Sequence, residues 1–344
     1  MNLELATPAY SRLDPDASAA LRRRRAAAQA TKTQSAVEYI LFGVFGLTVV
    51  LTAIALFALN SPSHRLVPNR VADGLRADRV NVLLIGTSTK TRPSGEEVAI
   101  DSLMLLSLKP STHQTALLSI PRDLYVKLAR YGEHRLASAH TIGDASGYPG
   151  EGAGLTTDTV EQVIGEPVHA FIRLDGPDLM KAIDRVGGVD IRVARGLYEY
   201  KTRDRFTAGM QHLDGARAFR YAMSPYVVGP QADRFARQAR QAQVIGALVT
   251  KLSETNGRAD WLTAAIGGQH STTNLTPEQL AMVRSVMTGS SDVAQATLEP
   301  LVDVQSVDIV GDAAREVVRP RGGDFNGIRQ VARDLFAGRA TAGL

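Results

Sequence analysis

A run of uncharged, mostly apolar residues from Tyr39 to Leu59 divides this 344-residue chain into a short basic segment and a long mixed one. At about 1.5 Å of rise per residue, a helix of this length is roughly 31 Å long, which matches the hydrocarbon core of a bilayer. The run is longer than the roughly 7–15 apolar residues of a cleaved signal peptide. The sequence therefore predicts an uncleaved membrane anchor followed by one large domain outside the bilayer.

The arginines that flank this run predict its orientation. Four consecutive arginines, residues 22–25, precede it, and positive flanks favour the cytoplasmic side. We therefore expect a single-pass protein of the cell membrane with a cytoplasmic N-terminus and an extracytoplasmic C-terminal domain. The formal net charge of the chain is only +4, so the arginine cluster is better explained as a topology signal than as a nucleic-acid site. No nucleic-acid partner is expected.

Composition predicts four parts of the chain. Residues 1–36, rich in Ala, Arg and Ser, are expected to form a disordered cytoplasmic tail, and residues 37–59 the transmembrane helix. Residues 60–78 contain two prolines and are expected to form a linker, which leaves residues 79–338 as the extracytoplasmic domain. The chain contains no cysteine, so this domain needs a core of its own rather than a disulfide framework.

Apolar runs within the domain predict an α/β fold. Residues 80–85, 103–108 and 115–120 are expected to be buried strands, and Lys109-Pro110-Ser111 indicates a hairpin between the last two. Two further strands are expected at residues 169–174 and 189–193, with a final strand pair near 296–309. Helices are expected at 177–186, through most of 214–287, and at 325–336. Strands interleaved with helices indicate an α/β domain.

Several catalytic motifs are absent from the sequence. The segment Gly86–Thr91 follows a strand but lacks the second glycine before lysine that a phosphate-binding loop requires. No G-x-S-x-G or H-E-x-x-H motif is present. These absences disfavour a P-loop nucleotide-binding enzyme, a serine hydrolase of the α/β-hydrolase type and a zinc hydrolase.

Charged residues lie at the ends of two predicted strands. Asp101 precedes the strand at 103–108, while Arg122 and Asp123 follow Ile120. Because a hairpin brings the start of its first strand near the end of its second, we expect these side chains to be neighbours at one edge of the sheet. Two interpretations stay open, namely a simple salt bridge, or a carboxylate that holds magnesium beside a guanidinium that binds phosphate.

A predicted helix at 231–252 directs arginines toward its apolar side. The apolar stripe of this helix consists of Val244, Ile245, Leu248 and Leu252. Extended toward the N-terminus, the stripe meets Arg234, Arg237 and Gln241. Buried guanidinium groups are costly unless they are paired, and an anion such as a pyrophosphate would offset this cost. Alternatively, the arginines at 234, 237 and 240 reach past the edge of the core into water.

These residues, in this order, resemble the LytR-CpsA-Psr family over residues 80–338. The resemblance rests on the segments Asn81–Gly86, Asp101–Pro110, Leu118–Asp123, Val186–Asp190, Leu213–Ala218 and Arg237–Gln241. Members are transferases of the bacterial envelope that move a glycopolymer from a polyprenyl-pyrophosphate carrier to peptidoglycan and form a phosphodiester. The resemblance implies a single α-β-α domain with a central mixed sheet and an apolar lipid pocket. It also implies a polyprenyl-linked glycan and a peptidoglycan acceptor as partners.

The resemblance also assigns roles to individual residues. Asp101 and Ser88 occupy the positions of ligands for Mg²⁺, the implied cofactor. Pyrophosphate-binding positions are occupied by Arg122, Arg135, Arg234, Arg237 and Gln241. Because phosphoryl transfer depends on positioning and charge neutralisation, guanidinium groups are suitable ligands. The catalytic candidates are Arg122 and two possible general bases, Asp101 and Asp123.

Four positions depart from the family pattern. Ser88 stands where members carry an aspartate, Met223 and Pro225 stand where they carry arginines, and Arg234 stands where they carry an aspartate. Two readings therefore stay open. The chain is a transferase with a rearranged site, in which Ser88 is a weak ligand and Arg234 replaces a lost cation. Otherwise it is a non-catalytic member that binds polyprenyl phosphates or envelope partners.

Overall fold

The protein is described by a computed structural model, and the residues that it describes belong to the unit 64–344. The described ranges are 69–92, 95–229, 232–254, 261–268, 271–290, 292–307 and 315–339. The predicted tail and membrane helix, residues 1–59, lie outside these ranges. Within the ranges given above, no helix combines the length and apolar character needed to cross a membrane.

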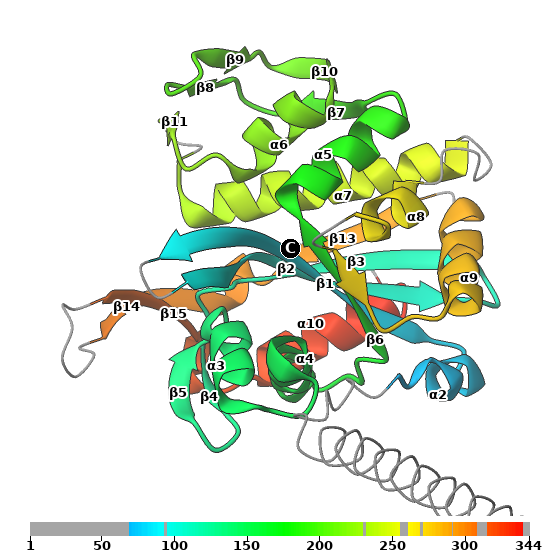
Figure 1. Cartoon of the computed structure of the whole chain (residues 1–344), viewed down its shortest axis with the longest axis vertical. Helices are drawn as coiled ribbons and strands as arrows, with labels where there is room; N and C mark the ends of the chain where they lie inside the picture. Colours follow the sequence, from blue (N-terminus) through cyan, green and yellow to red (C-terminus); the bar gives the residue numbers. More distant parts are fainter. Residues whose placement is uncertain are drawn as a thin grey trace, which may run out of the picture. The chain divides into compact units, whose positions relative to one another are not determined.

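A mixed six-stranded sheet forms the centre of the unit (Figure 1). Its order is β12-β6-β1-β2-β3-β13, and in that order the strands are Thr272–Thr273, Ala170–Asp175, Val80–Arg92, Gly95–Lys109, Gln114–Ile120 and Val293–Thr297. Strands β1, β2 and β3 are antiparallel, whereas β6 runs parallel to β1 and β13 runs parallel to β3. The predicted α/β class with a central mixed sheet is confirmed.

The β1–β2 hairpin extends well past the strands that the sequence predicted. Strand β1 was expected to end at Gly86, but it continues to Arg92 and pairs there with Gly95. The residues of this extension are polar, so apolar patterning could not reveal a strand that is held by backbone hydrogen bonds. The pairing is interrupted once, because Gly86 faces Ser102 while Thr87 faces Ile100. Asp101 is therefore the extra residue of a β-bulge, which re-aims its side chain.

Helices cover both faces of the sheet (Figure 1). One face carries α5 (Gly176–Arg185), α6 (Gly215–Met223), α7 (Arg234–Glu254), α8 (Trp261–Ile266) and α9 (Pro277–Thr288). The other carries α3 (Ser138–Ser146), α4 (Glu151–Ile164) and α10 (Asn326–Phe336). Alternation along β1 supplies both cores, because Val82 and Leu84 belong to the first while Leu83 and Ile85 belong to the second. The architecture is thus α-β-α.

Smaller sheets border this sandwich. Strands β7 (Val189–Val193) and β10 (Gly209–Leu213) form one pair, and β4 (Tyr125–Leu128) and β5 (Gly132–Arg135) form another. A three-stranded sheet has the order β11-β8-β9, with strands Val227–Val228, Leu197–Glu199 and Asp204–Phe206. The predicted pairing near 296–309 is wrong. Strand β13 pairs with β3, and β14 (Val302–Val307) pairs with β15 (Arg315–Pro320), because the parallel partner in the main sheet is distant in sequence.

The ordered part of the chain begins earlier than the sequence predicted. The helix α2 (Val71–Arg76) forms inside the segment expected to be a linker, and its Val71 is fully buried. The ordered domain therefore begins before residue 79.

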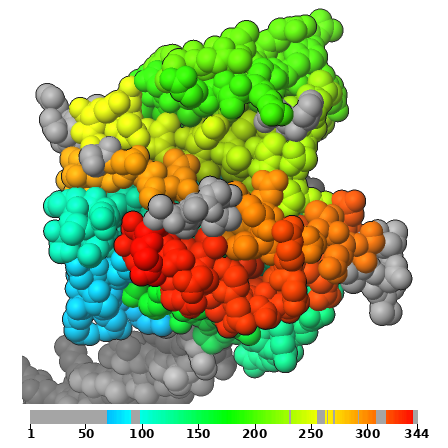
Figure 2. Space-filling view, turned by 180° about the vertical axis from the view of Figure 1, so that it is seen from behind, coloured from blue at the N-terminus to red at the C-terminus, as the bar shows by residue number. Residues whose placement is uncertain are grey.

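Seen from behind, the C-terminal elements from β13 to α10 (orange to red) form a band across the unit below α7 (Figure 2).

Candidate functional site

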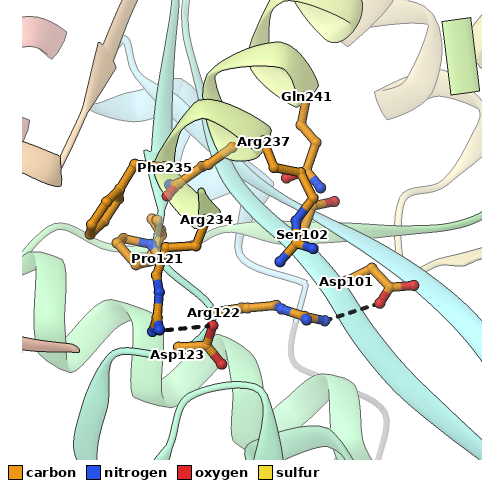
Figure 3. Close-up of a pocket in the computed structure, with 11 residues that line it drawn as sticks. Asp101, Ser102, Pro121, Arg122, Asp123, Arg234, Phe235, Arg237 and Gln241 are labelled. Carbon is orange, nitrogen blue, oxygen red and sulfur yellow. Dashed lines mark hydrogen bonds and ion pairs between the residues drawn. The ribbon is translucent and has the colours of Figure 1, made fainter. Parts of the chain in front are cut away.

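Two cavities meet where the bulge in β2 faces the first turns of α7, and Figure 3 shows the residues that line the smaller one. Both are lined by Asp101, Arg122, Arg237 and Gln241. The larger cavity has a volume of about 520 Å³, and its opposite wall is formed by α6, the end of β8 and the loop before β11. The structure therefore brings together residues from three distant segments that the sequence predicted to share a site.

Arg122 and Asp101 form an ion pair at the edge of the sheet. Arg122 Nη1 donates to Asp101 Oδ1 at 3.0 Å and to the carbonyl of Ile100 at 2.7 Å. The hairpin that places Arg122 beside the bulge thus confirms that these side chains are neighbours. A guanidinium carries five N–H donors, and no described residue accepts a hydrogen bond from Nε or Nη2 of Arg122. These donors are available to a ligand.

Arg237 supplies a second cation to the same place. Asp233 caps the helix by accepting hydrogen bonds from the N–H groups of Phe235 and Ala236, and this cap fixes where α7 begins. Arg237 follows in the first turn, and its guanidinium forms no ion pair or hydrogen bond with any described residue. Burial lowers the pKa of Arg237 below its ordinary value, and the charge of Arg122 lowers it further. A partly buried, unpaired cation at a helix N-terminus is a suitable site for an anion.

Gln241 completes the inward side of α7. Its side chain is 6% exposed, and its Nε2 lies 3.1 Å from Sδ of Met223. A thioether is a weak acceptor, so little free energy holds the amide in this orientation. Gln241 can therefore rotate to donate to a phosphate oxygen in the cavity.

A second group of charges beside the cavity is already paired. Asp123 receives a hydrogen bond from Nη1 of Arg135 at 3.3 Å, and Nη1 of Arg234 lies 3.9 Å from its other oxygen. Nη2 of Arg234 also donates to Glu316 at 2.5 Å. Arg234 lines the smaller cavity, whereas Arg135 lines neither. The structure thus places these two predicted pyrophosphate ligands in an ion-pair network.

Arg240 differs from the other arginines of α7. It is 3% exposed, and its Nε donates to the carbonyl of Tyr221 at 2.7 Å. Its guanidinium also lies 5.9 Å from the centre of the Tyr221 ring. Arg240 therefore joins α7 to α6 inside the fold and does not reach water at the edge of the core.

The side chains at the predicted magnesium positions do not form a complete set of ligands. Asp101 is paired with Arg122, and Ser88 faces Ala99 in the β1–β2 ladder without lining either cavity. In the described part of the chain, no cluster of three or more His, Cys, Asp or Glu side chains could hold a metal ion. Mg²⁺ usually takes one or two protein carboxylates together with phosphate oxygens and water. Of the two predicted positions, only Asp101 provides a carboxylate that borders the cavities.

An apolar crevice leads from the large cavity toward the sheet. The two spaces share Phe219 and Met223, and the crevice is otherwise lined mainly by Leu84, Met104, Leu174, Leu179 and Ile245. Its volume of about 30 Å³ holds no more than a few water molecules. The helices α8 and α9 pack in the core and do not border this crevice.

Sequence reasoning missed the opposite wall of the large cavity. Lys201 and Tyr226 lie there, with Nζ of Lys201 4.6 Å from the centre of the Tyr226 ring. Arg220 is a third side chain of this wall, but its guanidinium is paired with Asp204. The strands that bring these residues together are only two or three residues long, and their sole sequence signal is the alternation of Tyr198 and Tyr200.

Comparisons with known proteins agree with this geometry. The sequence pattern of the LytR_cpsA_psr family matches residues 57–315. The chain is 29% identical over 209 residues to the polyisoprenyl-teichoic acid–peptidoglycan teichoic acid transferase TagU of Bacillus cereus, a match covering 60% of this chain and 63% of TagU. The chain thus spans less than two thirds of the length of that relative.

Solved structures share the fold. TagV of B. subtilis superposes with a TM-score of 0.58 at 22% identity, covering 76% of this chain and 98% of TagV. TagT bound to LIIa-WTA superposes with a TM-score of 0.57 at 19% identity, covering 76% of this chain and 91% of TagT. Because the family pattern spans well over half of the sequence and the motifs at Asp101, Arg122 and Arg237 meet at one cavity, this chain belongs to the LytR_cpsA_psr family.

Proposed function

We propose that the domain transfers a glycan phosphate from a polyprenyl-diphosphate carrier to peptidoglycan and forms a phosphodiester. The relative TagU is named as a transferase that acts between polyisoprenyl-teichoic acid and peptidoglycan, and TagT has been solved with LIIa-WTA bound. The observation that carries the proposal is the convergence of Arg122 and Arg237 on one cavity, with donor groups that no described residue occupies.

The diphosphate is the part of the donor that these groups fit. Planar guanidinium groups match phosphate oxygens in geometry and in charge. Asp101 is paired with Arg122, and Arg237 has no ion pair with a described residue, so a cationic charge is left over that a diphosphate would balance. The amide of Gln241 adds a neutral donor from the same helix.

The proposed reaction needs charge neutralisation and one proton acceptor. A hydroxyl of peptidoglycan attacks the phosphorus atom that carries the glycan, and the bond from that phosphorus to the bridging oxygen breaks. The polyprenyl phosphate leaves, and the glycan phosphate becomes a diester with the acceptor. Arg122 and Arg237 stabilise the charge that develops on the phosphate oxygens. Asp101 lines both cavities and is the better candidate to accept the hydroxyl proton, because Asp123 is already bound by two arginines.

The lipid chain of the donor would enter the crevice behind the cavity. Phe219 and Met223 stand between the two spaces, so both side chains have to move before a prenyl chain can pass. A methionine changes its rotamer at little cost, which suits such a position. The proposed membrane anchor at residues 37–59, with a cytoplasmic N-terminus, would keep the domain beside its membrane-bound substrate.

Magnesium stays a prediction. If the ion binds, Asp101 is the one carboxylate that we assign to it, and the diphosphate oxygens would supply other ligands. The proposed roles of Arg122 and Arg237 do not depend on the ion.

The transferase proposal is tested with the full chain, a polyprenyl-linked glycan and peptidoglycan, with Mg²⁺ and with a chelator. The Arg122→Ala plus Arg237→Ala variant should lose at least about 100-fold in transfer rate, because each removed donor costs about that much in comparable sites. Arg319→Ala is the matched control, since Arg319 pairs with Glu133 away from both cavities. A wild-type protein no faster than the double variant would reject the enzyme reading.

The second reading, a non-catalytic lipid-phosphate binder, is favoured by the incomplete set of magnesium ligands. It keeps the same arginines but needs no proton acceptor. Binding of a polyprenyl diphosphate by an inactive wild-type protein, together with its loss in the double variant, would support this reading over the transferase.

A further inference from the structure

The three-stranded sheet β11-β8-β9 turns a row of aromatic side chains outward. In its register Val228 faces Tyr198, and Tyr198 faces Arg205. Beyond the last pair, the N–H of Tyr200 donates to the carbonyl of Tyr226 at 3.1 Å, so these two residues are also opposite each other. Since side chains alternate along a strand, these residues share one face of the sheet.

Burial shows which face points to solvent. The inner face includes four side chains that are at most 6% exposed, namely Leu197, Glu199, Phe206 and Val227. On the outer face, Tyr200 is 52% exposed and Val228 is 49% exposed. Exposed apolar side chains that adjoin one another, rather than lying singly, often mark a binding surface.

The rings on this face are held in defined positions. Tyr200 and Tyr226 meet edge to face, with ring centres 5.5 Å apart and an interplanar angle of 77°. A cation lies over each of two rings, because Lys201 contacts Tyr226 and the guanidinium of Arg205 lies 4.8 Å from the centre of the Tyr198 ring. The surface thus combines aromatic planes with positive charge.

The loop that follows β8, next to these rings, is held in place by a buried carboxylate. The buried carboxylate of Glu199 accepts hydrogen bonds from the N–H groups of Lys201 and Thr202 at 3.2 and 2.8 Å, and from the hydroxyl of Ser224 at 3.1 Å. These bonds join the end of β8 to the segment before β11. A surface that is already ordered loses less conformational entropy when a ligand binds.

The aromatic face is continuous with the proposed diphosphate site. Tyr226 and Lys201 line the same cavity of about 520 Å³ as Arg122 and Arg237. A chain attached to a diphosphate between those arginines and leaving the cavity along this wall would pass from Tyr226 to Tyr200 and then to Tyr198. This continuity favours the glycan of the donor as occupant, since it is covalently linked to the diphosphate.

We propose that Tyr198, Tyr200 and Tyr226 form a saccharide track that binds the first sugars of the donor glycan; this inference rests on the proposed function of the adjoining cavity. Pyranose rings present apolar C–H faces that pack on aromatic planes, while their hydroxyl groups need polar partners. Lys201 and Arg205 provide donors, and their charge favours a glycan that carries phosphate or carboxylate groups.

The test compares the binding of two soluble ligands, a short-chain polyprenyl diphosphate and the same lipid carrying a disaccharide. Binding is measured by calorimetric titration of the full chain in detergent. We expect the disaccharide to tighten binding by roughly ten-fold, the scale of two ring contacts. In Tyr200→Ala, and in Tyr198→Ala plus Tyr200→Ala, this advantage should fall stepwise toward one, while affinity for the bare lipid stays unchanged, because neither residue lines the cavity. Tyr125→Ala is the matched control, because Arg319 lies 4.7 Å from the centre of its ring and Tyr125 lines neither of the two cavities described above.

Three results would overturn the track. One is a disaccharide advantage that survives in both variants, and another is an equal loss for both lipids. The third is a variant whose KM rises for peptidoglycan but not for the glycan donor, which would assign the aromatic face to the acceptor. If the wild type binds neither lipid, the proposed function of the cavity fails, and saturation-transfer NMR with the free disaccharide decides the track separately. A saturation-transfer signal that is lost in Tyr200→Ala supports the saccharide track. Absence of that signal with the wild type contradicts it.

Discussion

Two groups of charges border the same cavity and differ in how completely they are neutralised. In the open group, Arg122 is paired with Asp101, and Arg237 has no ion pair with any described residue. In the closed group, two arginines meet two acids, because Asp123 binds Arg135 and Arg234, and Arg234 also binds Glu316. A sequence motif treats all four arginines alike, whereas their partners separate them.

The difference indicates which arginines serve a ligand. The closed group joins the end of β3 to β5, α7 and β15, so its charges hold the walls of the cavity in place. The open group carries one cation more than it has carboxylates, and this cation is partly buried. Unmatched charge near a cavity is costly to the fold and is therefore the better indicator of an anionic ligand.

The largest expected effect comes from changing the chemistry of the open group while keeping its charge. Arg122→Lys should lower kcat/KM for glycan transfer by about 100-fold, because a lysine cannot form the planar set of hydrogen bonds. Arg135→Lys is the control in the closed group and should change kcat/KM by less than about five-fold. Steady-state transfer kinetics measure both, and equal losses would remove the distinction between the groups.

Asp123→Asn should break the closed group. It leaves Arg135 and Arg234 without their shared carboxylate, and these side chains are partly exposed, so we expect a loss of about 1 kcal/mol in the free energy of unfolding. Urea denaturation measures the change. The affinity for a polyprenyl diphosphate should fall less than about three-fold, since Arg122 and Arg237 stay in place. A severe loss of affinity with unchanged stability would assign Asp123 to the ligand instead.

Arg237→Met should stabilise the free protein. The change removes a partly buried cation without a partner, and we expect a gain of about 0.5–1 kcal/mol, or roughly 2 °C in Tm. Arg240→Met, on the same helix, should instead destabilise, because Arg240 is buried and bound to the carbonyl of Tyr221. Differential scanning calorimetry without ligand distinguishes the two variants, and destabilisation by both would contradict an open group.

Glu199 extends the comparison to a carboxylate that is saturated by neutral donors. Burial opposes its ionisation, but the hydrogen bonds from Thr202, Ser224 and Lys201 outweigh it and hold the pKa of Glu199 below its ordinary value. A lowered folded-state pKa contributes stability above the unfolded value of 4.5, and this contribution is lost as the pH falls through the folded value.

Glu199→Gln should therefore flatten the decline of unfolding free energy below pH 4.5, and it should also lower stability slightly at neutral pH. Chemical denaturation between pH 3 and 7 measures both effects. An acid limb as steep in the variant as in the wild type would show that other carboxylates account for it.

Local patterns in the sequence predicted the open group but not the closed one. A hairpin follows from two apolar runs and a turn, so the proximity of Asp101 and Arg122 could be derived. The apolar stripe of α7, including Val244 and Leu248, likewise pointed Arg237 inward, and both stripe residues are buried. The partner of Arg234 lies 82 residues away, on strand β15, which the sequence did not predict.

The aromatic wall escaped prediction for a related reason. Strands β8 and β11 contain three and two residues, too few for periodicity to be visible, and they are fixed by the buried carboxylate of Glu199. The β-bulge at Asp101 is also a property of the paired backbone. Features that depend on contacts between distant segments were therefore the ones that the sequence did not reveal.

The central claim is that the unmatched charge of the open group binds a diphosphate. Calorimetric titration of a short-chain polyprenyl diphosphate into the wild type, Arg237→Met and Arg234→Met tests it most directly. We predict that affinity falls about 30-fold in Arg237→Met and less than about three-fold in Arg234→Met. Equal losses in the two variants, or a larger loss in Arg234→Met, would contradict the account.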